Sequence, residues 1–210
     1  FEFNDLYHEH VAYGTLNDSK GNPFKTREGG TKPLSELFNE TYNYIKNINN
    51  TLSDSTITHL TNSVLTFSDL ITNRKTDYKF DLEKFTNVNG KTGIYIQYSQ
   101  VRAKKLIDTT ENRKEEIKEL ILNKKDKQLL SKLFLFSHYL EQSALLNEPH
   151  HLANYLYEIS NLFNQFYESE KILEIEDSDH LSSKMYITNL FLTTSQNVMW
   201  CLGITPVNRM

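Results

Sequence analysis

The chain has 210 residues, of which 38% are apolar and 24% charged, and its formal net charge is −4. This composition is ordinary for one large or two small globular domains and excludes a disordered chain. No stretch approaches the roughly 18 uninterrupted apolar residues of a membrane-spanning helix. The negative net charge also argues against a general nucleic-acid binder, which usually carries a clear basic excess.

The charges are unevenly distributed along the chain. Residues 102–132 contain ten Lys and Arg against six Asp and Glu, whereas residues 133–210 contain three against nine. Any contact with RNA is therefore expected to be local and specific to one partner. On its own, the basic run is better explained as the solvated face of a helix.

The cysteine content and the start of the chain indicate a compartment. Cys201 is the single cysteine and cannot form an internal disulfide, which agrees with a reducing environment. The start lacks the features of a signal peptide, so we expect a cytoplasmic location and no membrane partner. Because the chain starts with Phe1, we expect it to be a fragment. The apolar neighbours of Cys201 predict a buried, unreactive thiol.

The first third of the chain predicts a strand, a loop and two helices. A strand is expected over residues 8–16, followed by a loop rich in turn residues that ends near Lys32. Pro33 suits a helix start, and apolar residues at helical spacing predict a helix over 33–49. Asp54 can cap a second helix that continues to about Ile71, so the two form an antiparallel pair.

The remaining chain predicts an extended segment and then helices only. Residues 78–85 alternate apolar and charged side chains, as a short strand does, and Asn89-Gly90 predicts a turn. Pro149 suits a first helical turn, and Gly203 followed by Pro206 ends the last helix. The expected helices cover residues 93–108, 111–123, 126–146, 149–168 and 180–202, and they predict a helical bundle.

Tyr95, Tyr98 and Arg102 lie three and four positions apart, on one face of a predicted helix. Two aromatic rings and a guanidinium group form a good surface for unpaired RNA bases, because each stacked base contributes roughly 1–3 kcal/mol. A tyrosine stripe at this spacing also fits a half-buried core. Spacing alone favours the core explanation.

Familiar catalytic and metal-binding motifs are missing. The sequence lacks a phosphate-binding P-loop, a dinucleotide fingerprint and paired cysteines at metal-ligand spacing. His8 and His10 alternate on the first strand and His150 is adjacent to His151, but neither pair has a third ligand at a familiar spacing. We therefore expect no metal site.

The loop 17–32 supports two explanations equally. Its glycines allow close backbone approach, and its basic residues could neutralise phosphate charge. It could equally be a mobile, charged surface loop. The basic residues are Lys20, Lys25, Arg27 and Lys32.

Five blocks of sequence, taken in order, resemble the C-terminal part of arginyl-tRNA synthetase, a class I aminoacyl-tRNA synthetase. The resemblance covers nearly the whole chain and is weakest over 50–90 and 109–130. The blocks are HVAYG from His10, GNPFKTREGGTKPLSEL from Gly21, GIYIQYSQVR from Gly93, PHHLANYLYEISNLFNQFYESEKIL from Pro149, and LGITPVNRM at the end.

The resemblance implies a mainly α fold with three parts. Residues 1–32 would be a C-terminal remnant of the α/β nucleotide-binding catalytic domain, and residues 33–90 a helical connector. Residues 91–210 would form the all-α anticodon-binding bundle of the DALR type.

The resemblance also places residues of the catalytic reaction in the loop. The segment from Phe24 to Gly30 stands where the family's equivalent of the Lys-Met-Ser-Lys-Ser loop is expected. Lys25 and Arg27 would stabilise charge on the departing pyrophosphate as catalytic residues. The remaining members of this phosphate loop are Phe24, Thr26, Gly29 and Gly30.

Residues of the bundle are implied to contact the anticodon of tRNA(Arg). They are Tyr95, Tyr98, Arg102, Tyr167 and Met210. These rings should be partly exposed and should lie close to one another in space. Stacking on tyrosines can select unpaired bases without a basic surface overall.

Two positions depart from the family pattern. Ile94 stands where the opening helix usually has a proline, which predicts a less rigid helix start. Lys184-Met185 replaces the Arg-Leu that usually opens the last long helix, which keeps the charge but loses a bidentate fork.

The full-length protein is expected to be an arginine-tRNA ligase that uses ATP with Mg²⁺ and L-arginine. This chain alone is expected to bind tRNA as a monomer, to hold no cofactor and to be inactive. A helical bundle for structural or protein-interaction roles is the alternative. A free-standing phosphate-binding enzyme built on the loop is a weaker third possibility.

Overall fold

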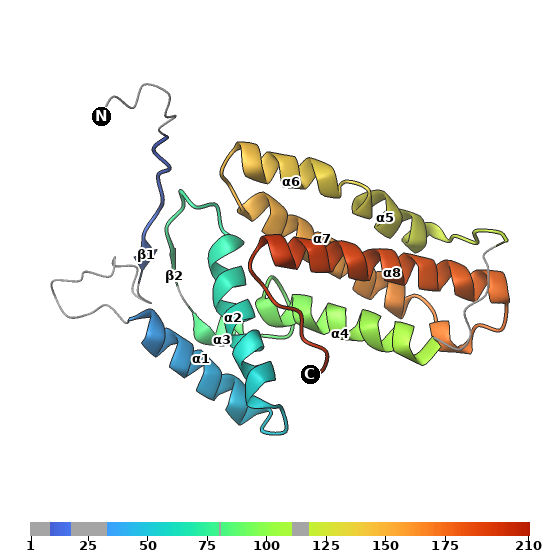
Figure 1. Cartoon of the computed structure of the whole chain (residues 1–210), viewed down its shortest axis with the longest axis horizontal. Helices are drawn as coiled ribbons and strands as arrows, with labels where there is room; N and C mark the ends of the chain where they lie inside the picture. The colour runs from blue at the N-terminus through green and yellow to red at the C-terminus, as the bar shows by residue number, and fades with distance from the viewer. Residues whose placement is uncertain (1–8, 18–32, 80, 111–117) are drawn as a thin grey trace, which may run out of the picture.

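The computed structural model describes residues 9–17, 33–79, 81–110 and 118–210, and these ranges are chiefly helical (Figure 1). The helices are α1 (Leu34–Ile48), α2 (Asp54–Leu70), α3 (Leu82–Phe85), α4 (Gly93–Thr110), α5 (Lys124–Leu133), α6 (Phe136–Leu145), α7 (His150–Glu168) and α8 (Ser178–Cys201), with a short 3-10 helix at Ile172–Glu174. Strands β1 (Leu16–Asn17) and β2 (Tyr78–Lys79) pair in parallel, Leu16 opposite Tyr78.

The helices α1 and α2 form the expected hairpin. The cap of α2 is Ser53 rather than Asp54, because the Ser53 hydroxyl accepts a hydrogen bond from the Thr56 backbone N–H at 3.2 Å. Asp54 instead binds Lys46 of α1 at 3.1 Å across the hairpin. The buried face of the hairpin packs against the start of α4 and the C-terminal tail through Ile45, Ile57, Leu60, Val64, Ile94 and Val207.

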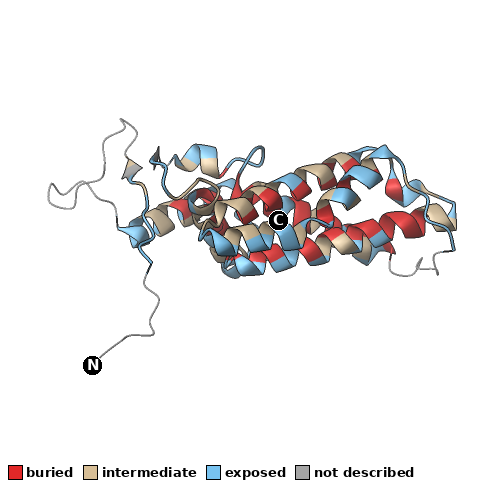
Figure 2. Cartoon of the chain, turned by 90° about the horizontal axis from the view of Figure 1, so that it is seen from above, coloured by how far each residue is buried: buried red, intermediate tan, exposed pale blue. Residues whose placement is uncertain are grey.

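The helices α4 to α8 form a long bundle, in which α6 packs on α7, and buried residues lie along the inward faces of its helices (Figure 2). Rings at the centre pack in parallel: the Phe163 and Phe191 centroids are 4.1 Å apart with an interplanar angle of 5°. The bundle predicted for the C-terminal half is therefore confirmed.

The prediction of a helix over 111–123 is wrong for its described part, since residues 118–123 are not helical. Two of their backbone N–H groups donate to side chains of α8 instead. Lys118 N–H donates to Asp179 at 3.2 Å, and Ile121 N–H donates to the Ser183 hydroxyl at 3.0 Å. Residues 111–117 lie outside the described ranges.

The single helix predicted over 126–146 is two helices. The helix α5 begins earlier because Asn123 and Asp126 form a capping box, each side chain accepting from the other's backbone N–H. It ends at Leu133, and α6 starts after Phe134 and Leu135, both of which are exposed. The helix α6 has no fully buried residue, and it packs on α7 through the half-buried rings of Phe136 and Tyr139.

The predicted strands are mostly absent from the described residues. Of the strand expected over 8–16, only Leu16 is in a strand, and residues 9–15 have no regular structure. Within 78–85, the chain leaves β2 and turns into α3, whose first turn is capped by Asp81 accepting from Lys84 N–H at 3.0 Å. The described ranges thus contain no layered α/β unit; residues 1–8 and 18–32 lie outside them.

The helix α4 starts in close contact with α2. A Cβ atom at Gly93 would lie 2.3 Å from the carbonyl oxygen of Ser63, so only glycine fits. Thr92 caps the helix, its hydroxyl accepting from Tyr95 N–H at 3.1 Å. Ile94 is buried in the core shared with the hairpin. Packing and capping therefore hold this helix start without a proline.

Lys184 forms a buried ion pair within the bundle. Its ammonium lies 2.7 and 2.8 Å from the two carboxylate oxygens of Asp126 on α5, and it also contacts Glu170. The Lys184 and Asp126 side chains are fully buried. The positive charge at this position thus joins α8 to α5 and to the segment after α7.

The prediction of a buried thiol at Cys201 is wrong, because Cys201 is exposed. Its neighbour Trp200 is 80% exposed as well, so apolar neighbours in the sequence did not indicate burial. In the last turn of α8 the inward positions belong to Val198, Met199 and Leu202. Gly203 then ends the helix with a φ of +71°.

Candidate nucleic-acid interface

A hollow of about 720 Å³ opens between α4, the end of α7 and the C-terminal tail. Four of the five residues predicted to contact an anticodon line it: Tyr98, Arg102, Tyr167 and Met210. They come from three separate segments that meet beside α4, where the C-terminus lies in Figure 1. The other lining residues are Val101, Lys104, Lys105, Asp108, Thr109, Asn208 and Arg209.

Arg102 joins the two tyrosines of the hollow. Its guanidinium carbon lies 4.4 Å from the ring centre of Tyr98 and 5.0 Å from that of Tyr167. Its Nη1 donates to Asn164 at 3.1 Å and to Glu168 at 3.0 Å. Although burial opposes the charge, these contacts with Glu168 and Tyr98 raise the pKa of Arg102. The guanidinium is thus held in place between two rings.

The rings of the hollow remain accessible. Tyr98 is 38% exposed, and Tyr167 and Met210 are half-buried. Partly exposed aromatic faces beside a thioether and a guanidinium can stack an unpaired base and hold a nearby phosphate. Tyr98, Arg102, Tyr167 and Met210 are thus partly exposed and close together, as expected, whereas Tyr95 does not line the hollow.

Tyr95 lies outside the lining of the hollow. Its half-buried ring packs against Tyr157 of α7 at 5.6 Å, and its hydroxyl donates to Asn161 at 3.3 Å. Desolvation by burial raises its pKa. Lys91 extends this neighbouring patch, its ammonium lying 5.5 Å from the Tyr157 ring centre.

The side of α7 that faces α4 carries polar residues at helical spacing. Asn164 links the two helices, accepting from Arg102 and donating to the Ser99 hydroxyl at 2.9 Å. Neither Tyr157 nor Asn164 was identified from the sequence. The signal that could have found them is the spacing of Tyr157, Asn161, Asn164 and Glu168 along one face of α7.

Gln97 holds the C-terminal tail against the bundle. This fully buried side chain accepts from Val207 N–H at 2.9 Å and donates to the Thr205 carbonyl at 2.8 Å. It also donates to the Ser63 hydroxyl of α2 at 2.7 Å. One amide therefore fixes the tail that brings Asn208, Arg209 and Met210 to the hollow.

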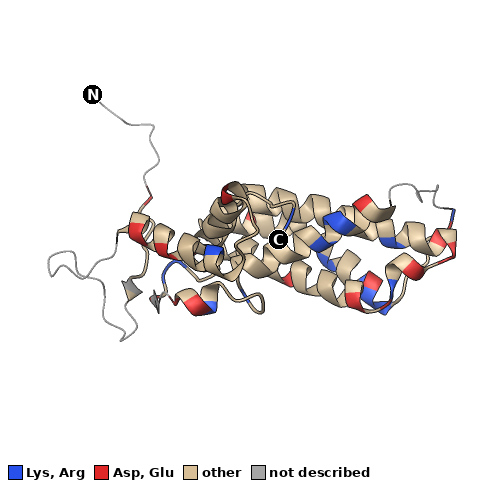
Figure 3. Ribbon diagram, turned by 90° about the horizontal axis from the view of Figure 1, so that it is seen from below, with Lys and Arg blue, Asp and Glu red and all other residues tan. Residues whose placement is uncertain are grey.

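The hollow is locally basic although the chain is acidic. Arg102, Lys104, Lys105 and Arg209 line it, against one lining carboxylate, Asp108, which lies 3.5 Å from the Lys104 ammonium. In the view of Figure 3, basic and acidic residues are interspersed along the helices of the bundle. The basic lining of the hollow therefore suits a local contact with an anionic ligand.

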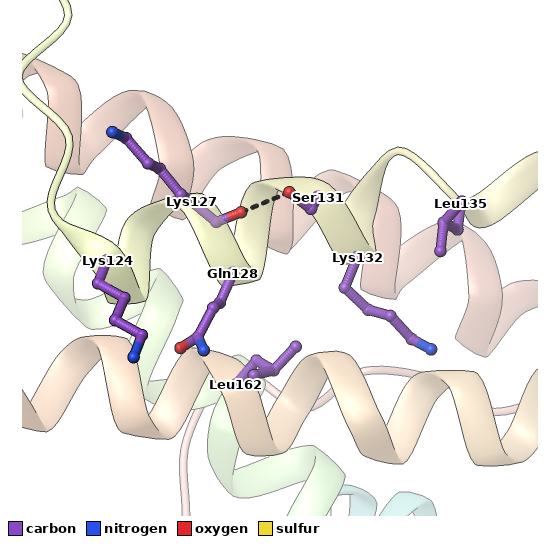
Figure 4. A pocket seen from close by; sticks show the side chains of 7 residues that line it. All are labelled: Lys124, Lys127, Gln128, Ser131, Lys132, Leu135 and Leu162. Atoms are coloured by element: carbon purple, nitrogen blue, oxygen red, sulfur yellow. Dashed lines mark hydrogen bonds between the residues drawn. The ribbon is translucent and has the colours of Figure 1, made fainter.

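A second hollow, of about 730 Å³, lies between α5 and α7 (Figure 4). It is lined by Lys124, Lys127, Gln128, Ser131, Lys132, Leu135 and Leu162, and none of these offers an aromatic face. Lys132 is engaged with Glu158 and donates to the Tyr139 hydroxyl at 2.7 Å. The first hollow, which has two tyrosine rings, is therefore the better candidate for base stacking.

The predicted phosphate loop cannot be placed. Phe24, Lys25, Thr26, Arg27, Gly29 and Gly30 all lie outside the described residues.

Among the described residues, no helix is long and apolar enough to cross a membrane.

Comparison with known proteins identifies the domain that carries the hollow. The sequence pattern of the DALR anticodon binding domain family matches residues 96–210. The chain belongs to this family. The matched range contains Tyr98, Arg102, Tyr167 and Met210, and it starts directly after Tyr95.

The curated relatives include arginine–tRNA ligases. That of Francisella tularensis subsp. novicida (strain U112) is 36% identical over 211 residues, which cover 96% of this chain and 36% of the relative. That of Pseudomonas fluorescens (strain Pf0-1) is 32% identical, with 96% of this chain and 37% of the relative covered. The chain therefore spans little more than a third of these relatives, and the resemblance to arginyl-tRNA synthetases is confirmed.

Solved structures share the fold of this DALR-domain chain. The arginyl-tRNA synthetase of Thermus thermophilus matches with a TM-score of 0.81 at 19% identity, over 96% of this chain and 35% of that one. The enzyme of Plasmodium falciparum matches with a TM-score of 0.72 at 20% identity, with the same coverage. The mainly α fold is thus that of a known helical domain.

Proposed function

We propose that this chain is the anticodon-recognising part of an arginine–tRNA ligase, and that unpaired anticodon bases of tRNA(Arg) bind in the hollow beside α4. The observation that carries this proposal is the convergence of Tyr98, Arg102, Tyr167 and Met210 on one surface. Stacking on the two rings supplies affinity, and hydrogen bonds to base edges supply selectivity. Lys104, Lys105 and Arg209 contact the phosphates.

Tyr95 has a separate role in this proposal. Because it lies with Tyr157 and Lys91 next to the hollow, it stacks or supports a neighbouring nucleotide rather than the base held by Arg102. The chain thus offers two aromatic positions on α4, Tyr95 and Tyr98, three residues apart.

For the full-length protein we propose the reaction that forms arginyl-adenylate from ATP and L-arginine and then transfers arginine to tRNA(Arg). Lys25 and Arg27 would stabilise the departing pyrophosphate there. We further propose the division into residues 1–32 of the catalytic domain, the connector 33–90 and the bundle 91–210. The present chain binds tRNA without catalysing either step.

The alternative, a structural bundle without RNA recognition, gives no reason for exposed aromatic rings, a guanidinium and three further cations around one hollow. A titration of the chain with tRNA(Arg) tests the proposal. Tyr98→Ala should weaken binding by about five- to hundredfold, from roughly 1–3 kcal/mol per stacked base. Tyr186→Ala, which removes an exposed tyrosine of α8, is the matched control and should bind normally. Equal affinity of all three proteins would contradict the proposal.

A further inference from the structure

The turn between α6 and α7 brings three potential metal ligands together. Glu148, His150 and His151 each present a ligand atom, and these atoms lie within 4.8 Å of one another. No third ligand lies at a familiar spacing from the histidine pair in the sequence. Glu148 supplies it, two residues before His150.

The turn that places these side chains is fixed by its own contacts. Asn147 adopts a left-handed conformation with φ +52°, which reverses the chain after α6. The backbone N–H of Glu148 then donates to the Ser143 carbonyl at 3.0 Å, and the Ser143 hydroxyl donates to the Glu148 carbonyl at 3.1 Å. Arg74 Nε donates to the Asn147 carbonyl at 2.8 Å from the neighbouring turn. The ligand-bearing backbone is therefore preorganised.

The carboxylate of Glu148 divides its two oxygens between different partners. Oε1 lies 3.0 Å from the Lys75 ammonium, whereas Oε2 faces His151 Nε2 at 3.3 Å and His150 Nδ1 at 4.0 Å. Carboxylate ligands of metals are commonly oriented by a partner of this kind on the second oxygen. Lys75 thus leaves Oε2 directed at the histidines.

His150 has a nitrogen that is available to a metal. His150 Nδ1 is buried and has no hydrogen-bond partner. It lies 4.0 Å from Glu148 Oε2, so a shared metal ion would supply the partner that this buried nitrogen lacks.

We propose that Glu148 Oε2, His150 Nδ1 and His151 Nε2 form a three-ligand site for a zinc-like divalent transition metal, with water at the open position. Donor atoms around a tetrahedral zinc are roughly 3.3 Å apart, given Zn–N and Zn–O bonds of about 2.0–2.1 Å. Two of the separations are 3.3 and 4.0 Å and all three are within 4.8 Å, so side-chain rotations that shorten the longer ones would reach this geometry. The two nitrogen ligands favour Zn²⁺ or Co²⁺ over Mg²⁺, which prefers oxygen.

This site is independent of RNA binding. His150 and Tyr167 are at opposite ends of α7, so the metal would hold the α6–α7 turn and leave the hollow unchanged. Its loss and the loss of RNA recognition can therefore be measured separately.

Calorimetric titration of the tag-free 210-residue chain with Zn²⁺ tests the site. One Zn²⁺ should bind per chain, and Mg²⁺ should not bind there. His151→Gln, at a side chain that is 33% exposed, should weaken Zn²⁺ binding by at least about tenfold. His138→Gln, which removes an exposed histidine of α6, is the matched control and should bind like the unmodified chain.

Two further measurements use the same proteins. Co²⁺ should give the intense visible absorption of a tetrahedral site in the unmodified chain and in His138→Gln, but not in His151→Gln or Glu148→Gln. Excess Zn²⁺ should raise the melting temperature of the unmodified chain and not of His151→Gln. Absence of Zn²⁺ binding, or equal affinity in His151→Gln and the unmodified chain, would overturn the proposal.

Discussion

Arg102 of α4 and Tyr167 of α7 lie against each other, with the guanidinium carbon 5.0 Å from the ring centre. The contact joins two helices and forms one wall of the hollow that the C-terminal tail closes. It places a permanent positive charge beside an aromatic face, the combination that binds an unpaired base together with its phosphate.

Arg102→Lys should weaken RNA binding although the charge is kept. The compact ammonium cannot lie flat over two rings while donating to Asn164 and Glu168. Loss of a cation–π contact of about 0.5–1 kcal/mol predicts a two- to fivefold weaker complex. The measurement is a titration with tRNA(Arg) at one fixed salt concentration. Tighter binding by the lysine variant would show that the guanidinium plane is not used.

Glu168→Gln should strengthen RNA binding. Glu168 is 64% exposed and lies 3.0 Å from Arg102 Nη1, so it competes with a phosphate for the same guanidinium. An exposed ion pair contributes roughly 0.2–1 kcal/mol, which predicts up to about fivefold tighter binding. Glu174→Gln removes a largely exposed carboxylate that pairs with Lys171 and is the control. Weaker binding of Glu168→Gln would mean that Glu168 orients Arg102 for the ligand.

Gln97→Leu should release the C-terminal tail. It leaves the Val207 N–H and the Thr205 carbonyl without their buried partner, at a cost of about 1–3 kcal/mol each if they stay buried. Urea unfolding should show a loss of this order, and RNA affinity should fall because Met210 moves. Deletion of residues 208–210 helps to separate the two effects: it should weaken RNA binding but lower the free energy of unfolding less than Gln97→Leu does, because Met210 is only partly buried against the hairpin core.

Lys184→Met should destabilise the bundle by about 3–5 kcal/mol, because Asp126 is left buried without its cation. The double variant Lys184→Met, Asp126→Leu removes both charges and should recover much of the loss. Chemical denaturation of the three proteins measures this. A single variant as stable as the unmodified chain would show that water reaches Asp126.

Acid should destabilise the α6–α7 turn in two steps. Burial, His151 and Arg74 lower the pKa of His150 below 6.5, while Glu148 opposes the shift, so the unfolded chain binds the proton more readily. The stabilisation is therefore complete above pH 6.5 and is lost as the pH falls toward the folded pKa. Lys75 lowers the pKa of Glu148 from its usual 4.5, so a second loss of stability follows as the pH falls below 4.5. Stability of His150→Gln, measured against pH with a chelator present to remove metal ions, should lack the first step.

Much of the fold followed from the sequence wherever apolar spacing and capping agreed. The helices α1, α2, α7 and α8 were predicted to within two residues of their bounds because their inward rows are long and Pro33, Pro149 and Gly203 mark their ends. The helix prediction is wrong for residues 118–123, because hydrogen-bond partners of their backbone, Asp179 and Ser183, belong to a helix that is distant in the sequence. Local spacing carries no information about such partners.

In the candidate site too, some features follow from local spacing and others depend on distant parts of the chain. Tyr95 and Tyr98 share a helix face, yet one packs on Tyr157 and the other lines the hollow, because α7 covers only the first. The resemblance to a known family pointed to Tyr167 and Met210, which line the hollow, whereas spacing along one helix could not point to them. Cys201 was misassigned from its apolar neighbours, since burial depends on which side of α8 faces the bundle.

The most direct test of anticodon binding in the hollow uses an anticodon stem-loop of tRNA(Arg) with the fluorescent base 2-aminopurine in the anticodon. Stacking on tyrosine should quench this base when the chain binds. Quenching should be lost in Tyr98→Ala, Tyr167→Ala and retained in Tyr186→Ala. If the double variant binds and quenches as the unmodified chain does, the anticodon does not enter the hollow.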